Sequence, residues 1–599
     1  MTMRQRLYNT CMAALAAMLL VSSFSAWAKR PNLVVMLADD WGYSDVGAFG
    51  SEIHTPHLNQ LAQNGTRFSN FHVSASCSPT RSMLLTGVDN HLNGVGNMRE
   101  TIPQSHVGRA GYLSVLNNRV VTVATLLQDS GYRTYVAGKW HVGKEPHNLP
   151  PARGFDRSLV MGDSGSDNWE TGKLYLDLTD KVYWYENGQE AKMPKEFYSS
   201  EFYISKTLDY LKTDAKSDKP FFAYVAFQAN HIPLQAPQEF IDKYKGKYDQ
   251  GWDVLRQERR NKAIELGLLP ANTPMAALPS THIAWDSLSP ADKAYHARRM
   301  EVYAAMAEAM DHHIGRLMAH LKDTGEYDNT VFVFLSDNGA EASDPYALAV
   351  GRWWLDQHYN RDIDKLGSKG AYSIIGPQWA SAATSPLSTY KFYAGEGGIR
   401  VPLIISGVPS KRKDDKPRIH HSLTHVNDIV PTLLDLAQVQ HPGSSYKGQS
   451  IYPLSGHSLL PVISGNAIRV RSPDEILGYE LSGNSALFKG DYKLVSNLAP
   501  VGDGKWHLYN IMTDPGETKD LQLKLPELFQ SMQADYAKWA KANGVLTMPE
   551  GYDPIQQVII NSLVFVYWPR YQWHLLGFVI LLTAGAAWAW RRRRARRTA

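Results

Sequence analysis

A cysteine opens the string CSPTRSMLLTG at residues 77–87. The chain has only two cysteines, and Cys11 lies in an N-terminal stretch typical of an export signal, so an exported body would keep Cys77 alone. A lone thiol cannot close an internal disulfide. Cys77 is therefore a small buried apolar residue, an oxidation-prone thiol, or a residue placed there for chemistry.

Two pairs of oxygen-bearing side chains follow predicted strands. Asp39 and Asp40 come directly after the apolar run 32–38, and Asp337 and Asn338 follow the run 331–335. In open α/β sheets, ligands collect beyond the carboxyl ends of the strands. Either pair alone is more simply explained as a helix cap or a turn. Together their four oxygens favour a hard cation, Ca²⁺ or Mg²⁺, over zinc.

Basic residues recur in distinctive strings further along the chain. Lys139 and His141 lie in GKWHVG and would share one face if residues 138–141 are extended. His231 follows the apolar run 221–227 within NHIPLQAP, and Lys391 lies in YKFYAGEGGIRVP. Each of them alone would be an ordinary surface or core residue. As a set they could bind an anion and donate a proton to a leaving group.

The combination resembles the formylglycine-dependent sulfatases of the alkaline phosphatase superfamily. In their signature, a modifying enzyme reads a Cys, a Pro two residues on and an Arg four residues on, as in CSPTR here. The resemblance extends over nearly the whole body, from GYSDVGAFG near the start to LYNIMTDPGETKDL at residues 508–521. It is strongest to the bacterial aryl and alkyl sulfatases, whose HxPLQAP and GGIRVP stretches are similar to those here.

The resemblance implies a function and a role for each candidate residue. The reaction would convert an aryl or alkyl sulfate ester to an alcohol or phenol plus sulfate. A formylglycine-generating enzyme would oxidise Cys77 to 3-oxoalanine, whose hydrate is a diol that can release sulfate by elimination. One Ca²⁺, rather than Mg²⁺, would be held by Asp39, Asp40, Asp337, Asn338 and the modified Cys77. Arg81 would fix the diol, and Lys139 and Lys391 would bind the sulfate group. His231 would protonate the leaving group, and His141 would remove the second diol proton.

Two alternatives remain open at this point. A phosphonate or phosphate ester hydrolase can share the same fold and the same modified cysteine. An unconverted chain could instead bind sulfated ligands without turning them over, because conversion depends on an outside enzyme.

The elements needed to position these residues predict an α/β fold. Short apolar runs at 32–38, 134–137, 221–227, 331–335 and 401–405 suit buried strands of a mostly parallel sheet, and helical periodicity lies between them at 56–65, 121–131 and 299–325. We expect a catalytic domain at residues 29–414, with polar insertions near 240–295 and 340–390 covering the site. Short strands and a final helix predict a smaller antiparallel-sheet subdomain at 415–545.

Both ends of the chain point to the membrane. Residues 1–28 read as a signal peptide, and after a linker at 546–572 an apolar segment at 573–590 precedes an arginine-rich tail at 591–599. The positive-inside rule predicts a single span with a cytoplasmic tail and a body on the periplasmic face of the inner membrane. Of the 62 basic residues, two lie in the signal and six in the tail, so the body is mildly acidic and has no basic field for nucleic acid.

Overall fold

The computed structural model describes residues 30–169, 174–176, 179, 181–279, 282–408 and 418–597. The predicted signal peptide therefore lies outside the described residues. At the centre is a ten-stranded sheet in the order β11-β2-β10-β9-β1-β8-β4-β5-β6-β7. Its strands are β1 Asn32–Ala38, β2 Gly65–Phe68, β4 Arg133–Lys139, β5 Arg157–Met161, β6 Trp184–Glu186, β7 Gln189–Glu190, β8 Phe221–Ala226, β9 Thr330–Ser336, β10 Leu403–Ser406 and β11 Arg418–His420.

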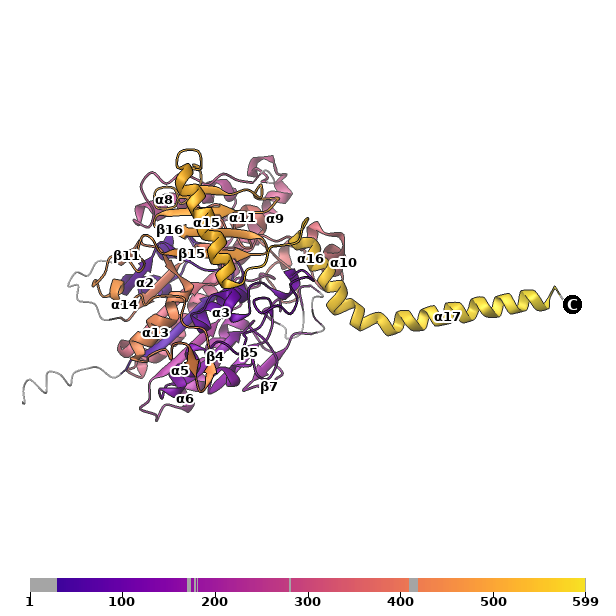
Figure 1. Cartoon of the computed structure of the whole chain (residues 1–599), viewed down its shortest axis with the longest axis horizontal. Helices are drawn as coiled ribbons and strands as arrows, with labels where there is room; N and C mark the ends of the chain where they lie inside the picture. The colour runs from indigo at the N-terminus through magenta and orange to yellow at the C-terminus, as the bar shows by residue number, and fades with distance from the viewer. Residues whose placement is uncertain are drawn as a thin grey trace, which may run out of the picture.

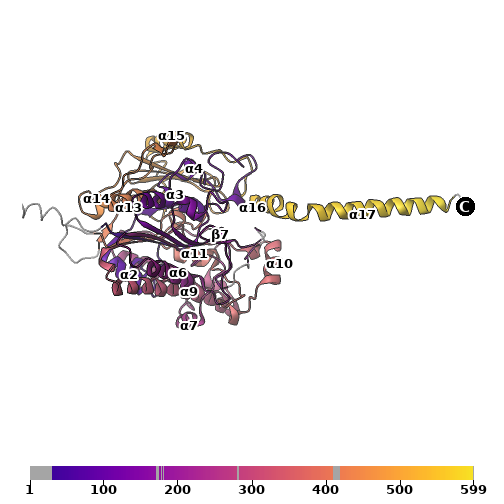
Figure 2. The same cartoon turned by 90° about the horizontal axis from the view of Figure 1, so that it is seen from below.

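Helices cover both faces of the sheet, which is why its central strands are apolar on both sides (Figure 2). Val34 and Met36 of β1 join one core, and the alternate residues Leu33 and Val35 join the other. The first core is closed by α2 Pro56–Asn64, α6 Ser199–Thr213 and α9 Pro290–Asp323, and the second by α3 Cys77–Thr86, α5 Val123–Asp129 and α13 Ile429–Ala437.

The middle of the sheet, from β9 to β5, is parallel throughout. β10 runs antiparallel to β9, and β6 and β7 extend the far edge in antiparallel fashion. The mostly parallel α/β sheet expected from the sequence is confirmed. Helix α9 begins at Pro290 rather than near Arg299, because Ser289 caps it by accepting the Asp292 N–H and proline suits the first turn.

A smaller antiparallel sheet follows, again as expected. It contains β15 Ile476–Leu481, β16 Asn484–Lys489, β17 Tyr492–Ser496 and β18 His507–Asn510, and α15 Pro526–Asn543 packs on it. Buried charges join it to the main body. His91 Nε2 lies 2.8 Å from Glu480, and Lys493 Nζ lies 2.9 Å from Glu396 and 2.8 Å from Glu517.

The two predicted insertions form short helices rather than irregular loops. The first contains α7 Gln238–Ile241 and α8 Gly251–Glu265, and the second contains α10 Ala349–His358 and α11 Gly376–Ala383. Trp379 in α11 is fully buried, whereas Trp353 in α10 is 63% exposed.

The chain ends in a long helix that leaves the body (Figure 1). α16 Pro554–Ser562 passes through a π-helical turn, Leu563–Tyr567, into α17 Trp568–Ala595. This continuous helix is long and apolar enough to cross a membrane: its most apolar 18-residue window has a mean hydropathy of 1.5, and none of that window is buried. The segment expected to be a linker thus contains α16, which packs against the short 3-10 helix η2 Arg99–Thr101.

Candidate active site

Strand pairing brings the two oxygen-bearing pairs together. In the parallel ladder of β1 and β9, Ala38 lies opposite Ser336, so Asp39 and Asp337 emerge side by side at the carboxyl edge of the sheet. Asp40 has a left-handed backbone (φ 64°), and its N–H donates to Asp337 Oδ1 at 3.2 Å. A backbone held in this sparsely populated region marks a site whose geometry the surroundings impose.

Cys77 completes this cluster from the other side. It is the first residue of α3 and is 1% exposed. Its Sγ lies 3.4 Å from Asp39 Oδ1 and 3.8 Å from Asp40 Oδ1. Possible metal-ligating atoms of Asp39, Asp40, Cys77 and Asp337 all lie within 4.8 Å of one another. Asn338 joins them, because its Nδ2 donates to Asp40 Oδ1 at 2.7 Å.

The donor set fits a hard cation. Asp40 Oδ2 and Asn338 Oδ1 are buried without a hydrogen-bond partner, although buried oxygens are normally satisfied. Burial, with the adjacent Asp39 carboxylate, raises the pKa of Asp40 to about 7 despite the opposing effect of Lys391. A divalent cation between these oxygens would satisfy them and relieve the crowding of negative charge.

Arg81 anchors the cluster from the second turn of α3. Its Nε and Nη2 lie 2.9 and 2.7 Å from Asp337 Oδ2, and its Nη1 donates to the Lys139 carbonyl at 2.8 Å. Burial would lower the pKa of Arg81, but Asp337 and Asp39 outweigh it and hold the guanidinium charged. Arg81 is thus a fixed positive charge beside Cys77.

Lys139 reaches the cluster from the end of β4. Its Nζ lies 2.7 Å from Asp39 Oδ2. The condition for Lys139 and His141 to share one face, an extended backbone over residues 138–141, is not met, because β4 ends at Lys139 and His141 has a left-handed φ of 58°. His141 nevertheless stays near the cluster: burial, followed by Lys139 and Arg81, lowers its pKa well below the usual value.

Lys391 and His231 close the opposite side. Lys391 Nζ lies 2.7 Å from Asp40 Oδ1 and 2.8 Å from Glu341 Oε2. Burial would lower the pKa of Lys391, but Asp40 and other neighbouring acids raise it well above its usual value, so the lysine stays charged. His231 Nε2 lies 3.9 Å from Asp40 Oδ2 and 3.3 Å from Ser164 Oγ. Burial and the lysines Lys139 and Lys391 lower the pKa of His231 to about 3.

All ten candidate residues therefore lie in one cluster, but sequence reasoning missed three of its neighbours. Glu341 pairs with Lys391, Ser164 contacts His231, and the ring of Tyr175 packs edge-on against His231 at 5.9 Å. Glu341 comes three residues after Asn338, so its place just past the SDNG turn was a usable signal. Ser164 and Tyr175 come from a loop without a comparable pattern.

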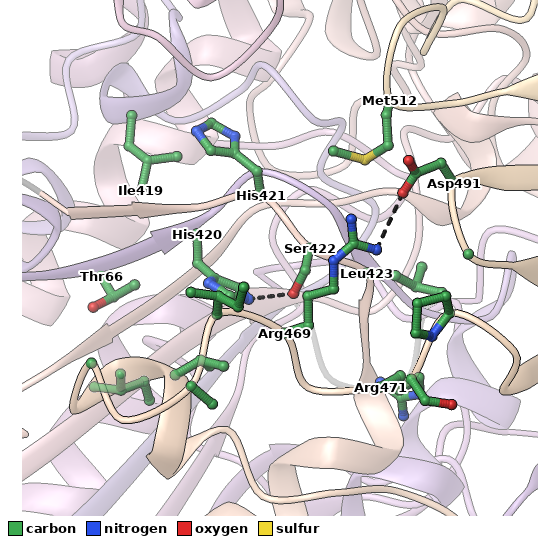
Figure 3. Close-up of a pocket in the computed structure, with 18 of the residues that line it drawn as sticks. Thr66, Ile419, His420, His421, Ser422, Leu423, Arg469, Arg471, Asp491 and Met512 are labelled. Atoms are coloured by element: carbon green, nitrogen blue, oxygen red, sulfur yellow. Dashed lines mark hydrogen bonds and ion pairs between the residues drawn. The ribbon is translucent and has the colours of Figure 1, made fainter.

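A cavity of ≈ 640 Å³ lies elsewhere in the described part of the chain (Figure 3). It is formed at β11 against the smaller subdomain and contains none of the candidate residues. Its arginines are already paired, since Arg469 lies 3.5 Å from Asp491 and Arg471 binds Asp428. The chemistry therefore resides at the carboxyl edge of the sheet and not in this cavity.

Three buried cations converge on a buried thiol and on a cluster of oxygens that could hold a cation, an arrangement suited to the chemistry of small anionic esters. Comparisons with known proteins identify the family. The sulfatase family model matches residues 31–439. The chain is 39% identical over 546 residues to an uncharacterised sulfatase of Schizosaccharomyces pombe, covering 88% of this chain and 96% of that protein. It is 37% identical over 453 residues to an arylsulfatase of Klebsiella aerogenes, and the match covers 75% of this chain and 95% of that protein.

Solved structures agree in fold. The crystal structure of Ps i-CgsB in complex with k-i-k-neocarrahexaose matches with a TM-score of 0.60 and 22% identity, covering 90% of this chain and 97% of that one. The PsFucS1 sulfatase from Pseudoalteromonas sp. matches with a TM-score of 0.55 and 20% identity, and the match covers 87% of this chain and 92% of that one. This chain belongs to the sulfatase family and is a hydrolase of sulfate esters.

Proposed function

We propose that this sulfatase hydrolyses aryl or alkyl sulfate monoesters with Cys77 converted to formylglycine and one Ca²⁺ bound beside it. The observation that carries the proposal is the position of Cys77 Sγ, 3.4 Å from Asp39 Oδ1 at the edge of a buried oxygen cluster. A nucleophile at that point would be adjacent to the cation and to the charges that bind sulfate.

Asp39, Asp40, Asp337 and Asn338 would hold the Ca²⁺, with the modified Cys77 side chain completing the set. The ion, when bound, supplies Lewis-acid stabilisation of the nucleophilic oxygen and of a sulfate oxygen. The chain itself sets the geometry, because the β1–β9 ladder fixes the carboxylates and Arg81 holds Asp337.

An unmodified Cys77 is poorly suited to the reaction. Burial and the nearby carboxylates raise the pKa of its thiol well above the usual value, so it stays protonated at neutral pH. The thiolate is the reactive form of cysteine. Oxidation to formylglycine, which hydrates to a geminal diol, would instead supply an oxygen nucleophile. Arg81, next to it and permanently charged, favours the ionised form of that oxygen.

Lys139 and Lys391 would bind the sulfate. Both are buried and held charged by carboxylates, at 2.7 Å from Asp39 and Asp40 respectively. Fixed positive charges in a dry site stabilise developing negative charge far better than they would in water. Glu341 keeps a second contact with Lys391 and so holds this ammonium in place when Asp40 binds the cation.

His231 would protonate the leaving alcohol or phenol after the negative charge of a bound sulfate ester raises the pKa of its ring from about 3 and favours the protonated form. Its Nδ1 lies 2.7 Å from the Ile232 carbonyl, which fixes the ring and directs Nε2 toward Asp40 and Ser164. His141, on the other side of Lys139, would take the proton whose removal allows sulfate to leave. Its Nδ1 is buried without a hydrogen-bond partner and can accept that proton.

Mass spectrometry of peptides spanning residue 77 tests the conversion. Formylglycine is about 18 Da lighter than cysteine. Protein made with a formylglycine-generating enzyme should show this loss and should react at residue 77 with a hydrazide, whereas the C77A variant should do neither and should have no activity. Active protein that shows only an unmodified thiol at this residue would exclude the mechanism.

Two rival functions are separated by rates. Turnover of 4-nitrophenyl sulfate should exceed turnover of the matching phosphate mono- and diesters and phosphonates, and a dominant phosphodiester activity would favour the phosphate or phosphonate hydrolase. A protein that keeps the unmodified thiol at residue 77 and binds sulfate esters with no turnover would favour the binding role.

We further propose that the body lies on the periplasmic face of the inner membrane after removal of the signal peptide. Six arginines follow the apolar segment of the helix that could cross the membrane, whereas Arg570 alone lies at the start of α17, and this imbalance supports a cytoplasmic tail. Protease added to spheroplasts should then digest the body and spare the tail.

A further inference from the structure

The start of the C-terminal helix is attached to the loop 97–106 by buried hydrogen bonds. Asn561, at the end of α16, is 3% exposed, and its Nδ2 donates to the carbonyls of Arg99, Glu100 and Ile102 at 3.2, 2.9 and 2.9 Å. Gln104 Nε2 donates to Asn561 Oδ1 at 3.0 Å. The helix is therefore docked on the body rather than tethered to it.

The loop 97–106 lies at the rim of the active site. Burial raises the pKa of the Glu100 carboxyl. The charges of Lys391 and Lys139 act to lower this pKa and that of Asp163 to raise it, so Glu100 lies within electrostatic range of all three. Lys391 and Lys139 are the two proposed sulfate ligands. Glu100 thus lies within electrostatic range of both lysines, and its carbonyl accepts a hydrogen bond from Asn561 of α16.

A second rim segment also meets the helix. Arg570, in the first turn of α17, donates from Nη2 to the Thr179 carbonyl at 3.3 Å. In the same loop as Thr179, Tyr175 packs its ring against the proposed proton donor His231. Two loops that border the site are therefore both bound to the C-terminal helix, one at Asn561 and one at Arg570.

A third segment adds an apolar surface on this side. α10 follows Glu341 by eight residues and presents Leu348 at its start, Val350 and Trp353 to solvent, with 40%, 72% and 63% of each exposed. In both views α10 and α16 lie at the end of the body from which α17 leaves (Figures 1 and 2). Exposed tryptophan and valine in one helix suit the interface of a bilayer.

The length of helix between Asn561 and the apolar segment sets how far the side of the body that bears α10 and α16 lies from the membrane. Twelve residues separate Asn561 from Trp573, where the apolar segment begins, and at about 1.5 Å per residue they extend roughly 18 Å. The headgroup layer takes up several ångströms of that distance. No break in the helix allows the body to turn away, because α16 continues through the π-helical turn into α17.

We propose that the mouth of the active site faces the bilayer that α17 spans, and that the substrate is an amphiphilic sulfate ester held in that bilayer. The sulfate head would enter between the loops bound to the helix while the apolar tail passes along α10. This inference rests on the proposed function and narrows its substrate class to lipid-like alkyl or aryl sulfates.

The test compares one soluble and one membrane-held substrate, using the full chain reconstituted in phosphatidylcholine vesicles. The substrates are 4-nitrophenyl sulfate and hexadecyl sulfate dissolved at a low mole fraction in the same vesicles. The double variant V350S/W353S removes the apolar surface of α10. Its kcat/KM should fall about tenfold for hexadecyl sulfate and change less than twofold for 4-nitrophenyl sulfate.

The matched control is I468S/L523S, which removes two apolar side chains that are even more exposed, at 89% and 91%, but lie in the smaller subdomain region. It should leave both rates unchanged. Equal rates on hexadecyl sulfate for V350S/W353S and wild type, or equal losses on both substrates, would overturn the proposal while turnover of 4-nitrophenyl sulfate still upholds the proposed function. If the wild-type protein turns over neither substrate, the proposed function itself would be refuted.

A readout independent of activity locates the bilayer directly. A fluorescent label on W353C should be quenched by brominated lipids, and the same label on L523C should not, with the unsubstituted chain giving the background. Equal quenching at both positions would show that α10 does not face the membrane.

Discussion

Calcium should stabilise the folded protein, and the size of the effect follows from the cluster around Asp40. An ion that binds only the folded state at 100 times its Kd adds about 2.7 kcal/mol. The unfolding entropy grows with chain length, so 1 kcal/mol shifts Tm by roughly 1 °C for a body of this size. Removing Ca²⁺ with a chelator should therefore lower Tm by roughly 3 °C.

The D40N variant makes the prediction specific. Asparagine keeps an oxygen to accept the Asn338 hydrogen bond but removes a ligand charge and the crowding that raises the Asp40 pKa to about 7. If affinity falls tenfold, the stabilisation at the same Ca²⁺ concentration drops to about 1.4 kcal/mol. The calcium-dependent shift in Tm should then be about half that of wild type, while the chelated variant should be no less stable than chelated wild type.

Differential scanning fluorimetry with and without Ca²⁺, together with titration calorimetry for stoichiometry, measures both quantities. D311N is the matched control, because Asp311 is equally buried and burial also raises its pKa to about 7, but it binds the N–H groups of His57 and Leu58. Its calcium-dependent shift should equal that of wild type. A full shift in D40N, or a loss in D311N, would refute the assignment of Asp40 as a calcium ligand.

Three other predictions concern proton transfer and buried charge. H231A should slow esters of alkyl alcohols by about 10²- to 10⁴-fold and 4-nitrophenyl sulfate much less, and equal losses across leaving groups would argue against His231 as the acid. His91 is fully buried; burial would lower its pKa, but hydrogen bonding of its ring to the carboxylates of Asp89 and Glu480, which accept, raises it to about 9. Its stabilisation, of order 3 kcal/mol, should be complete below pH 6.5 and lost as pH rises through 9, and H91Q should flatten that part of the urea-unfolding profile. K493M leaves the buried Glu396 and Glu517 without their shared cation and should cost about 3–5 kcal/mol in urea unfolding, whereas a loss below 1 kcal/mol would show that the network is not buried as described.

The sequence predicted the sheet, and the meeting of the two oxygen-bearing pairs at its carboxyl edge, because both depend on local pattern. β1 forms at residues 32–38 as expected, and an acidic pair directly after a buried strand must emerge at the carboxyl edge. The position of His141 could not be predicted in the same way. Its left-handed backbone is imposed by the packing of the chain after β4, and nothing in GKWHVG signals it.

Contacts between distant segments were beyond sequence reasoning. Asn561 reads as an ordinary polar residue in a linker, and only the folded chain shows that it binds three carbonyls of the loop 97–106. The ion pair between Glu341 and Lys391 could not be predicted either. The two residues are 50 positions apart, and the local sequence around neither of them indicates the other as its partner.

Asp39 and Asp337 lie side by side at the ends of two paired strands, and this has a consequence for how the metal site forms. Their proximity comes from main-chain pairing between β1 and β9, which the apolar core stabilises by itself. The chain can therefore fold without any metal, and an ion that binds at this edge can be gained, lost and regained afterwards. Maturation in an environment with fluctuating calcium would then be reversible at this step, unlike the oxidation of residue 77.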